Sequence, residues 1–371
     1  MRETTDVLVI GAGVFGLWVA LETAKAGVSV ILVERDRPGA GASGGVVGAL
    51  TPHMPVRWRP MKQFQLDALQ SMQAATDQLT AETGVETGYS LSGRLSPLAD
   101  SRARDRAIEH AMAADAQWHR GARFEVLDAP PCDVSGFLPD ASCPNGLVRD
   151  TLSGRVTPRL YIKALTAAVE RVADLRTGWH ALQLDARTGT ARFRQGEIEA
   201  GTIVLAAGHQ CAALCPPAAT GGVKGQAALL RATTPDDMPV VQMPHLYIVR
   251  QPHGLVAIGS TSEKAWGDPN PDQMLDDVID RARLLCPSLR HAEVVERWAG
   301  IRPKPPGRDP TIGFLPGAER VYLATGGYKI GLGIAHLVGK GAAADLSGTQ
   351  AAFPIPTDFS PGSQGSPAQT N

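Results

Sequence analysis

The sequence has few cysteines, little net charge and few aromatic residues. Its five cysteines, an odd number among 371 residues, match neither a C-x-x-C pair nor a zinc-site spacing, which indicates buried or idle thiols rather than a disulfide framework or a metal site. Lys and Arg total 36 against 37 for Asp and Glu, so the net charge is −1. Without a basic excess, the composition gives no support for nucleic acid as a partner.

Long hydrophobic runs are also absent. The first residues lack a basic segment followed by a long apolar stretch, and the first apolar run is too short to span a bilayer. We therefore expect a cytoplasmic protein with no membrane span. The length and the 43% hydrophobic content suffice for a large core and favour two domains. From residue 348 to residue 371 the chain is rich in Ser, Pro, Gly and Gln, which predicts a flexible tail.

A strand–helix–strand pattern opens the chain. Branched apolar residues over 7–10 predict a buried strand, and apolar residues at helical spacing over 14–26 predict a helix that ends at Gly27. Residues 28–33 predict a second strand, and Glu34 closes it. The glycine-rich turn 11–16 lies between the first strand and the helix. This order matches the fingerprint of dinucleotide-binding proteins.

The glycines and the acidic residue of that fingerprint each have a physical role. Gly11 permits the tight turn, Gly13 lets the backbone approach a pyrophosphate, and Gly16 lets the helix pack closely on the strand. The phosphates would rest on the helix N-terminus. Glu34 would accept hydrogen bonds from a ribose diol and repel a 2′-phosphate, so FAD or NAD fits better than NADP.

The remaining pattern is mixed. A pliant loop of small residues covers 39–45. We expect helices over 60–83, 101–120, 157–173, 271–285 and 331–346, and strands over 146–150, 203–208, 223–232, 245–250, 255–260, 294–299 and 321–324. One sheet would thus collect strands from three separated parts of the chain, with a β-rich domain inserted between them.

Five motifs in order resemble one family. They are the turn 11–16 with Glu34, then Gly-Ala-Ser-Gly at 41–44, Val-Lys-Gly-Gln at 223–226, Trp-Ala-Gly-Ile-Arg-Pro at 298–303 and Thr-Gly-Gly-Tyr at 325–328. Over about residues 5–347 the chain resembles the FAD-dependent D-amino acid oxidase, glycine oxidase and sarcosine oxidase superfamily. The resemblance implies an α/β fold. It consists of a glutathione-reductase-type, Rossmann-like FAD-binding domain and an inserted α+β substrate domain whose mixed or antiparallel sheet roofs the flavin.

The resemblance also implies domain boundaries. The FAD-binding domain would comprise residues 1–55, 149–222 and 301–347. The substrate domain would comprise residues 56–148 and 223–300, followed by the tail at 348–371.

The cofactor implied by the resemblance is FAD. The residues expected to contact it are Gly11, Gly13, Val14, Phe15, Gly16, Glu34, Arg35, Ala42, Ser43, Gly44, Ala206, Ala207, Gly208, Arg302, Gly327, Lys329, Gly331, Leu332 and Gly333. Sarcosine oxidases attach their flavin through a cysteine near the last motif. No cysteine follows Cys286 here, so we expect the FAD to be noncovalent.

For catalysis, the resemblance assigns Arg302 to the substrate carboxylate, a task that suits a planar, bidentate guanidinium. Lys329 stands where relatives usually have an arginine after the glycines, and it keeps the positive charge without the fork. Tyr328 adjoins it in the same motif. His53 and Tyr247 are further candidates, at the rim of the site and on a strand of the roof respectively.

The predicted function is oxidation of the C–N bond of a small amino acid or secondary amine of the glycine, D-amino acid or N-methyl amino acid class. A hydride would pass to flavin N5, and the resulting imine would hydrolyse. Oxygen or another acceptor would then take the electrons, and a dehydrogenase that uses a quinone or a protein stays an alternative. So do a flavin-dependent tRNA wobble-uridine enzyme, which shares the loop style of 41–52, and a flavin-binding module without activity. The sequence does not indicate an oligomeric state.

Overall fold

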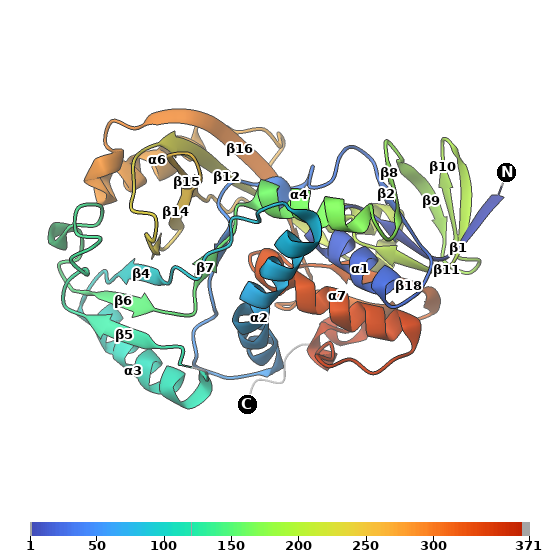
Figure 1. Cartoon of the computed structure of the whole chain (residues 1–371), viewed down its shortest axis with the longest axis horizontal. Coiled ribbons are helices and arrows are strands. Elements are labelled where there is room, and N and C mark those ends of the chain that lie inside the picture. The colour runs from blue at the N-terminus through green and yellow to red at the C-terminus, as the bar shows by residue number, and fades with distance from the viewer. Residues whose placement is uncertain (1, 120, 366–371) are drawn as a thin grey trace.

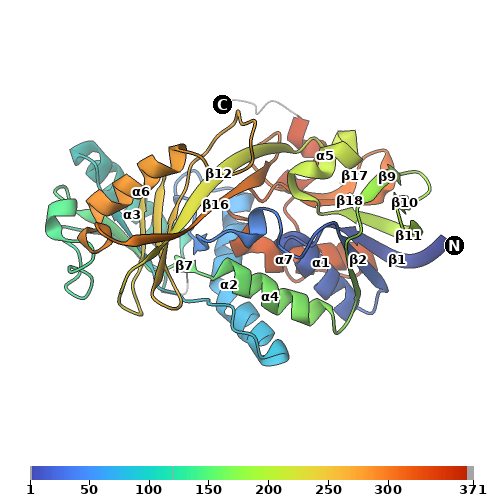
Figure 2. The same cartoon turned by 90° about the horizontal axis from the view of Figure 1, so that it is seen from above.

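The chain folds around two large β-sheets that lie end to end, with helices packed on them (Figures 1 and 2). The structure is a computed structural model, which describes residues 2–119 and 121–365. No helix among these residues is long and apolar enough to cross a membrane. The mixed α/β architecture agrees with the fold class expected from the sequence.

The first sheet has a parallel centre. Its strand order is β17-β18-β11-β1-β2-β8, in which only β17 runs antiparallel to its neighbour, and the β9–β10 hairpin extends from β11. The strands come from three distant parts of the chain, as predicted. They are β1 (Arg2–Ile10), β2 (Val30–Glu34), β8 (Asp174–Thr177), β9 (Ala181–Asp185), β10 (Thr190–Phe193), β11 (Gly196–Leu205), β17 (Thr311–Leu315) and β18 (Ala318–Thr325).

Helices α1 (Val14–Lys25) and α7 (Gly331–Ser347) pack on this sheet, and two further helices pack on them. Helix α1 is buried over most of its surface because the sheet, α7 and α4 (Pro158–Val169) pack around it, and α2 (Pro60–Thr83) packs in turn on α7 and α4. A Cβ at Gly339 of α7 would lie 2.7 Å from the carbonyl oxygen of Trp18 in α1, so only glycine allows this close packing.

The second sheet is mainly antiparallel. Its order is β16-β12-β15-β14-β13-β4-β6-β5. The strands are β4 (Arg94–Pro97), β5 (Phe124–Leu127), β6 (Leu147–Asp150), β12 (Gly221–Arg231), β13 (Val240–Met243), β14 (Leu246–Gln251), β15 (Leu255–Gly259) and β16 (Glu293–Lys304). A small pair, β3 (Ala49–Leu50) with β7 (Gly154–Arg155), lies apart from both sheets.

Strand alternation gives this sheet two different faces. Ala228, Leu230, Ile248 and Ile258 belong to a core that includes helix α6 (Met274–Leu285). Intervening residues such as Ala227, Val249 and Ala257 form a smaller cluster with Val46 and Trp298 on the opposite face. Side chains that alternate along each strand therefore separate the helix-covered core from the face that turns toward the first sheet.

The sequence patterns located most elements but not all. The helix expected over 101–120 is α3 (Ser101–Gln117), which begins at Asp100, whose side chain accepts a hydrogen bond from Ala103 N at 2.7 Å. Strands β4, β5, β8, β9, β10, β13 and β17 were not predicted, since most are short and several are exposed on one side. The strand expected over 294–299 is longer, and β16 includes Arg302 rather than ending before it.

The composition predicts a flexible tail from residue 348, whereas the described part of this segment packs on the core. Phe359 is fully buried, and its ring meets Phe64 of α2 edge-on with 5.4 Å between the centroids. Ile355 lies against Gly341 of α7. A few apolar residues within a polar, proline-rich segment were enough to anchor it. Residues 366–371 lie outside the described part of the chain.

Truncating the buried ring of the C-terminal segment tests this packing. We expect Phe359→Ala to lower the free energy of unfolding by ~3–5 kcal/mol, because the substitution leaves a cavity beside Phe64. Leu284→Ala, on the exposed face of α6, should cost less than about 0.5 kcal/mol. Urea denaturation of both variants measures the difference. Equal stabilities would mean that residues 349–365 do not pack on the core.

Candidate functional site

A cavity of about 910 Å³ lies where the two sheets meet. The first sheet contributes residues at the carboxyl ends of its parallel strands, including Gly11, Glu34, Ala206 and Thr325. The second sheet contributes residues from β12, β14 and β16. The carboxyl edge of an open parallel sheet is the usual place for a ligand in α/β proteins.

The β1–α1 turn is built by close backbone contacts. Gly11 has φ of +106°, and a Cβ there would lie 2.7 Å from the carbonyl oxygen of Ala206. A Cβ at Gly16 would lie 1.9 Å from the carbonyl oxygen of Gly11. Gly16 therefore shapes the turn without lining the cavity, while Gly11, Gly13, Val14 and Phe15 line it. The first turn of α1 faces the cavity, with Gly13 as its N-cap.

Glu34 lies at the end of β2 beside this turn. Its Oε2 accepts a hydrogen bond from Ala12 N at 2.9 Å, and its Oε1 accepts one from Asp36 N at 3.0 Å. These bonds fix the carboxylate at the cavity wall, and each oxygen keeps a further lone pair for a ribose hydroxyl. Arg35 also lines the cavity, where its Nη1 donates to Gln210 Oε1 at 3.1 Å.

The loop of small residues approaches the same turn. Ser43 Oγ accepts a hydrogen bond from Val14 N at 3.0 Å, and both Ala42 and Ser43 line the cavity. Gly44 does not line it. Its carbonyl oxygen accepts from Arg159 Nε at 3.1 Å, and a Cβ there would lie 2.2 Å from Gly39 O, so this glycine supports the loop.

Two further segments complete the first sheet's side. Ala206, Ala207 and Gly208 follow β11 and line the cavity, as do all the expected residues after β18, namely Gly327, Tyr328, Lys329, Gly331, Leu332 and Gly333. The Lys329 ammonium lies 5.5 Å from the centre of the Tyr328 ring, and Tyr328 Oη lies 3.2 Å from Ser262 Oγ. The N-terminus of α7 is therefore at the cavity, beside a lysine.

Arg302 reaches the cavity from the second sheet. Its Nη2 donates to Ser260 Oγ at 2.6 Å and its Nη1 to Thr261 O at 3.1 Å. A Cβ at Gly225 of β12 would lie 1.9 Å from Nη2, so the guanidinium lies flat against that glycine. Burial lowers the pKa of Arg302, yet a guanidinium stays charged. Among the described residues no carboxylate comes within ion-pair distance of it.

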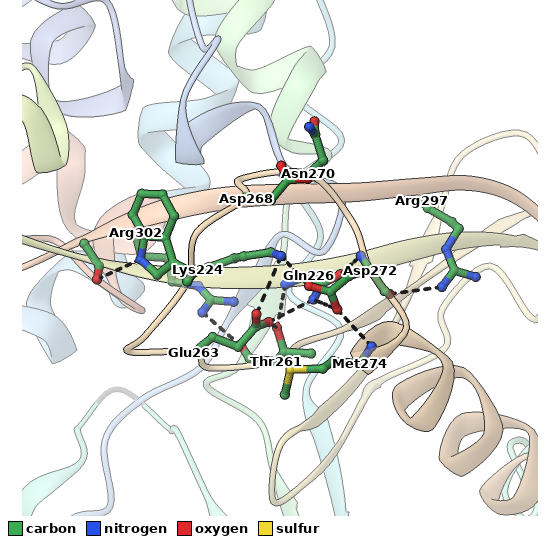
Figure 3. A network of polar contacts seen from close by, with 12 residues as sticks. Lys224, Gln226, Thr261, Glu263, Asp268, Asn270, Asp272, Met274, Arg297 and Arg302 are labelled. Carbon is green, nitrogen blue, oxygen red and sulfur yellow. Dashed lines mark hydrogen bonds and ion pairs between the residues drawn. The ribbon is translucent and has the colours of Figure 1, made fainter.

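A polar network fastens the segment that holds Arg302 (Figure 3). Lys224 of β12 is 1% exposed, and its Nζ lies 2.6 Å from Asp272 and 3.6 Å from Glu263. Gln226 Nε2 donates to Glu263 at 2.9 Å and to Asp272 at 2.8 Å. Thr261 donates to Glu263 as well. The segment 260–272 is thereby fixed to β12, together with the oxygens that Arg302 contacts.

Of the two remaining expected catalytic residues, Tyr247 and His53, one lines the cavity and the other does not. Tyr247 lines the cavity, on β14. His53 is not among the cavity-lining residues. Its side chain is exposed, and its Nδ1 lies 2.6 Å from Oε1 of Gln65, which does line the cavity.

Several cavity residues were missed from the sequence. The main ones are Gln242, His245, Ser260, Trp266 and Trp298. Trp298 lies in one of the quoted motifs, and a Cβ at Gly300 would lie 2.4 Å from its indole, so the tryptophan covers that glycine. Gln242 belongs to a strand that was not predicted, and no motif marked it.

The arrangement fits a bound FAD. The glycine turn and the α1 N-terminus suit a pyrophosphate, the fixed Glu34 carboxylate suits a ribose, and the cavity continues from there to Arg302. When bound, FAD would be held by the segments 11–15, 34–35, 42–43, 206–208 and 327–333. A dinucleotide cradle that opens onto a chamber lined by Arg302 and Lys329 is the arrangement expected of an FAD-dependent oxidoreductase.

Comparison with known proteins identifies the family. The model of the FAD dependent oxidoreductase family, DAO, matches residues 6–346. The chain belongs to this family, and it is an FAD-dependent enzyme.

Individual relatives agree. The glycine oxidase of Pseudomonas aeruginosa is 30% identical over 345 residues, which cover 89% of this chain and 91% of the relative. The crystal structure of glycine oxidase from Geobacillus kaustophilus has a TM-score of 0.87 at 24% identity, covering 96% of this chain and 98% of that one. L-proline dehydrogenase from P. horikoshii has a TM-score of 0.83 at 19% identity, covering 97% and 98%. The likeness to these two structures establishes the fold.

The cofactor cradle can be tested at its tightest point. We expect Gly11→Ala to abolish most FAD binding, because its Cβ would collide with the Ala206 carbonyl and alanine disfavours the positive φ. Gly136→Ala, where a Cβ meets nothing within 4 Å, is the matched control. Flavin released by acid precipitation, counted per chain, gives the occupancy. Full occupancy of Gly11→Ala would place the pyrophosphate elsewhere, and flavin that stays in the precipitate would contradict noncovalent binding.

The polar network predicts a pH dependence. Hydrogen bonds from Gln226 and Lys224 lower the pKa of Asp272 from 3.8 to about 2. Because the folded pKa is the lower one, the carboxylate stabilises the protein above pH 3.8, and this contribution is lost as the pH falls toward 2. The stability difference between the wild type and Asp272→Asn should be constant above about pH 5 and fall to about half by pH 3. Denaturation midpoints measure it, and a difference that persists unchanged at pH 3 would contradict the shift.

Proposed function

We propose that this protein oxidises the C–N bond of a small amino acid or N-substituted amino acid. The observation that carries the proposal is Arg302, a half-buried guanidinium that faces the cavity and has only neutral oxygens as hydrogen-bond partners. A buried cation needs an anion once water is excluded, and a planar fork pairs best with a carboxylate. The similarity to glycine oxidase, whose name states its substrate, supports an amino acid.

The chain's own residues divide the work. Arg302 binds the substrate carboxylate and so fixes the adjacent C–N bond, while Trp298 and the roof strands exclude water. When bound, FAD supplies the hydride acceptor, at its N5 atom. The α7 N-terminus and Lys329 place positive charge at the far edge of the cavity, and they would stabilise the negative charge of a reduced flavin bound there. No side chain needs to act as a base if the amine binds in its neutral form.

Lys329 does not narrow the choice of substrate. An ammonium is a point charge without the paired donors of an arginine, so it adds positive charge to this edge of the cavity without selecting a substrate shape. Glycine, a D-amino acid and an N-methyl amino acid all carry the carboxylate that Arg302 would bind. A panel of such compounds, mixed with the holoenzyme without air, identifies the substrate by bleaching of the flavin. Admitting air then separates an oxidase, which recovers its colour at once, from a dehydrogenase.

Arg302 substitutions test the carboxylate contact. Arg302→Ala should retain FAD, raise the KM for the substrate found in the panel and lower kcat/KM by ~10²-fold or more, as expected for loss of a charged hydrogen-bond partner. Arg302→Lys should recover only part, since an ammonium cannot offer two parallel donors. Steady-state kinetics measure both. Near wild-type kcat/KM in Arg302→Ala would mean that Arg302 does not bind the substrate carboxylate, and the proposal of an amino acid substrate would lose its main support.

A second pair of variants tests the position of the Arg302 guanidinium through the strand that it packs against. A methyl group at Gly225 would displace the Arg302 guanidinium, whereas at Gly221 of the same strand the nearest atom would be 3.7 Å away. Gly225→Ala should therefore share the KM defect of Arg302→Ala, and Gly221→Ala should not.

A further inference from the structure

A row of polar side chains crosses the second sheet from its interior to the cavity. Asp150 of β6 and Arg94 of β4 are opposite each other in register, and so are Gln242 of β13 and Tyr247 of β14. Strands β6, β4, β13 and β14 are consecutive neighbours. Asp150 is fully buried and Arg94 is 2% exposed, whereas Gln242 and Tyr247 line the cavity.

These four side chains form a continuous chain of contacts. Arg94 Nε lies 2.6 Å from Asp150 Oδ2, and Arg94 Nη1 donates to Gln242 Oε1 at 2.6 Å. Gln242 Nε2 in turn donates to Tyr247 Oη at 3.0 Å. Asp150 also accepts from Ser153 N at 2.7 Å and from Ser153 Oγ at 3.0 Å, so its carboxylate is held firmly and orients Arg94.

The chain fixes the direction of every hydrogen bond along it. Arginine can only donate, so the oxygen of the Gln242 amide must face Arg94. The amide nitrogen, which also only donates, must then face Tyr247, and the phenol oxygen must accept. The single phenol hydrogen is thereby turned away from Gln242 and is left for a partner in the cavity.

We propose that Gln242 is a positioning residue that determines specificity, because it forces Tyr247 to donate its hydrogen to the substrate. Arg302 and Tyr247 would then both present donors to one group. They lie close, since Ser260, which contacts Arg302, follows Gly259, the register partner of Tyr247. A carboxylate accepts from both, whereas the NH₂ of a carboxamide meets donors only. The inference rests on the proposed function and selects a carboxylate over its amide.

Gln242→Glu reverses the polarity at almost constant size. One carboxylate oxygen would pair with Arg94, and the other would accept from Tyr247, which turns the phenol hydrogen away from the cavity. The probes are acetate and acetamide, titrated into the FAD-loaded protein and followed by the change in flavin absorbance. The Kd of acetate should rise about tenfold or more, and the preference for acetate over acetamide should fall by a similar factor.

Two neutral variants separate polarity from packing. Tyr247→Phe, which lacks the donor, should weaken acetate binding about as much as Gln242→Glu does. Gln242→Met removes the bond that directs the phenol hydrogen but leaves the hydroxyl able to donate, so it should raise the Kd of acetate by clearly less than Gln242→Glu does. FAD content reports whether each variant is folded. An unchanged Kd in Gln242→Glu or in Tyr247→Phe would overturn the proposal.

The added charge of the glutamate needs its own control. If Gln242→Glu acts through the hydroxyl, it should add less than about twofold to the Kd of the Tyr247→Phe variant. A full additional tenfold there would show simple repulsion and overturn the proposal. Arg302→Ala keeps the two hypotheses distinct. Acetate that binds equally well without Arg302 refutes the proposed function, whereas a loss in Arg302→Ala with no effect of Gln242→Glu refutes only the role of Gln242.

Discussion

The close backbone contact at the β1–α1 turn is the constraint on which the rest of the structure depends. Gly11, Gly16 and Ala206 approach so nearly that no side chain fits between the turn, the helix start and the end of β11. This contact sets where α1 begins, and α1 is the helix on which α4 and α7 pack. The same turn therefore positions both the cofactor cradle and the helix at the centre of the largest core, so a substitution there affects both.

The second sheet has two different faces, since one face covers the cavity with polar groups and the other packs on an apolar core. Alternation along its strands sends apolar residues to α6 and leaves the other face for the site. The buried charged groups of this sheet have charged or polar partners. Lys224 has two carboxylates, and Asp150 has a guanidinium and several donors. Such networks on neighbouring strands place donors rigidly, which loop residues cannot do as well.

The sequence predicted the parts of the structure that local motifs specify, and it did not predict those that depend on contacts between distant segments. The βαβ unit was predictable because Gly11, Gly16 and Glu34 stand at spacings fixed by local geometry, and Arg302 was found through its motif. Gln242 and Arg94 were not, because their role arises from pairing between strands almost 150 residues apart. His53 shows the converse limit, since proximity to the cofactor loop in sequence did not bring it to the cavity wall. The packed position of Phe359 depends on a surface of α2 that composition alone does not reveal.

The order of strands in the first sheet has a consequence for biosynthesis. Its centre joins β1, β11 and β18, which are separated by nearly the whole chain, and α7 follows only after β18. Parallel pairing across such distances is slow because a long loop must close before any contact forms. A nascent chain that has emerged as far as β11 still lacks one wall of the cavity. Because the segment between β18 and α7 lines the cavity, the site for the flavin is complete only once this late part of the chain has folded.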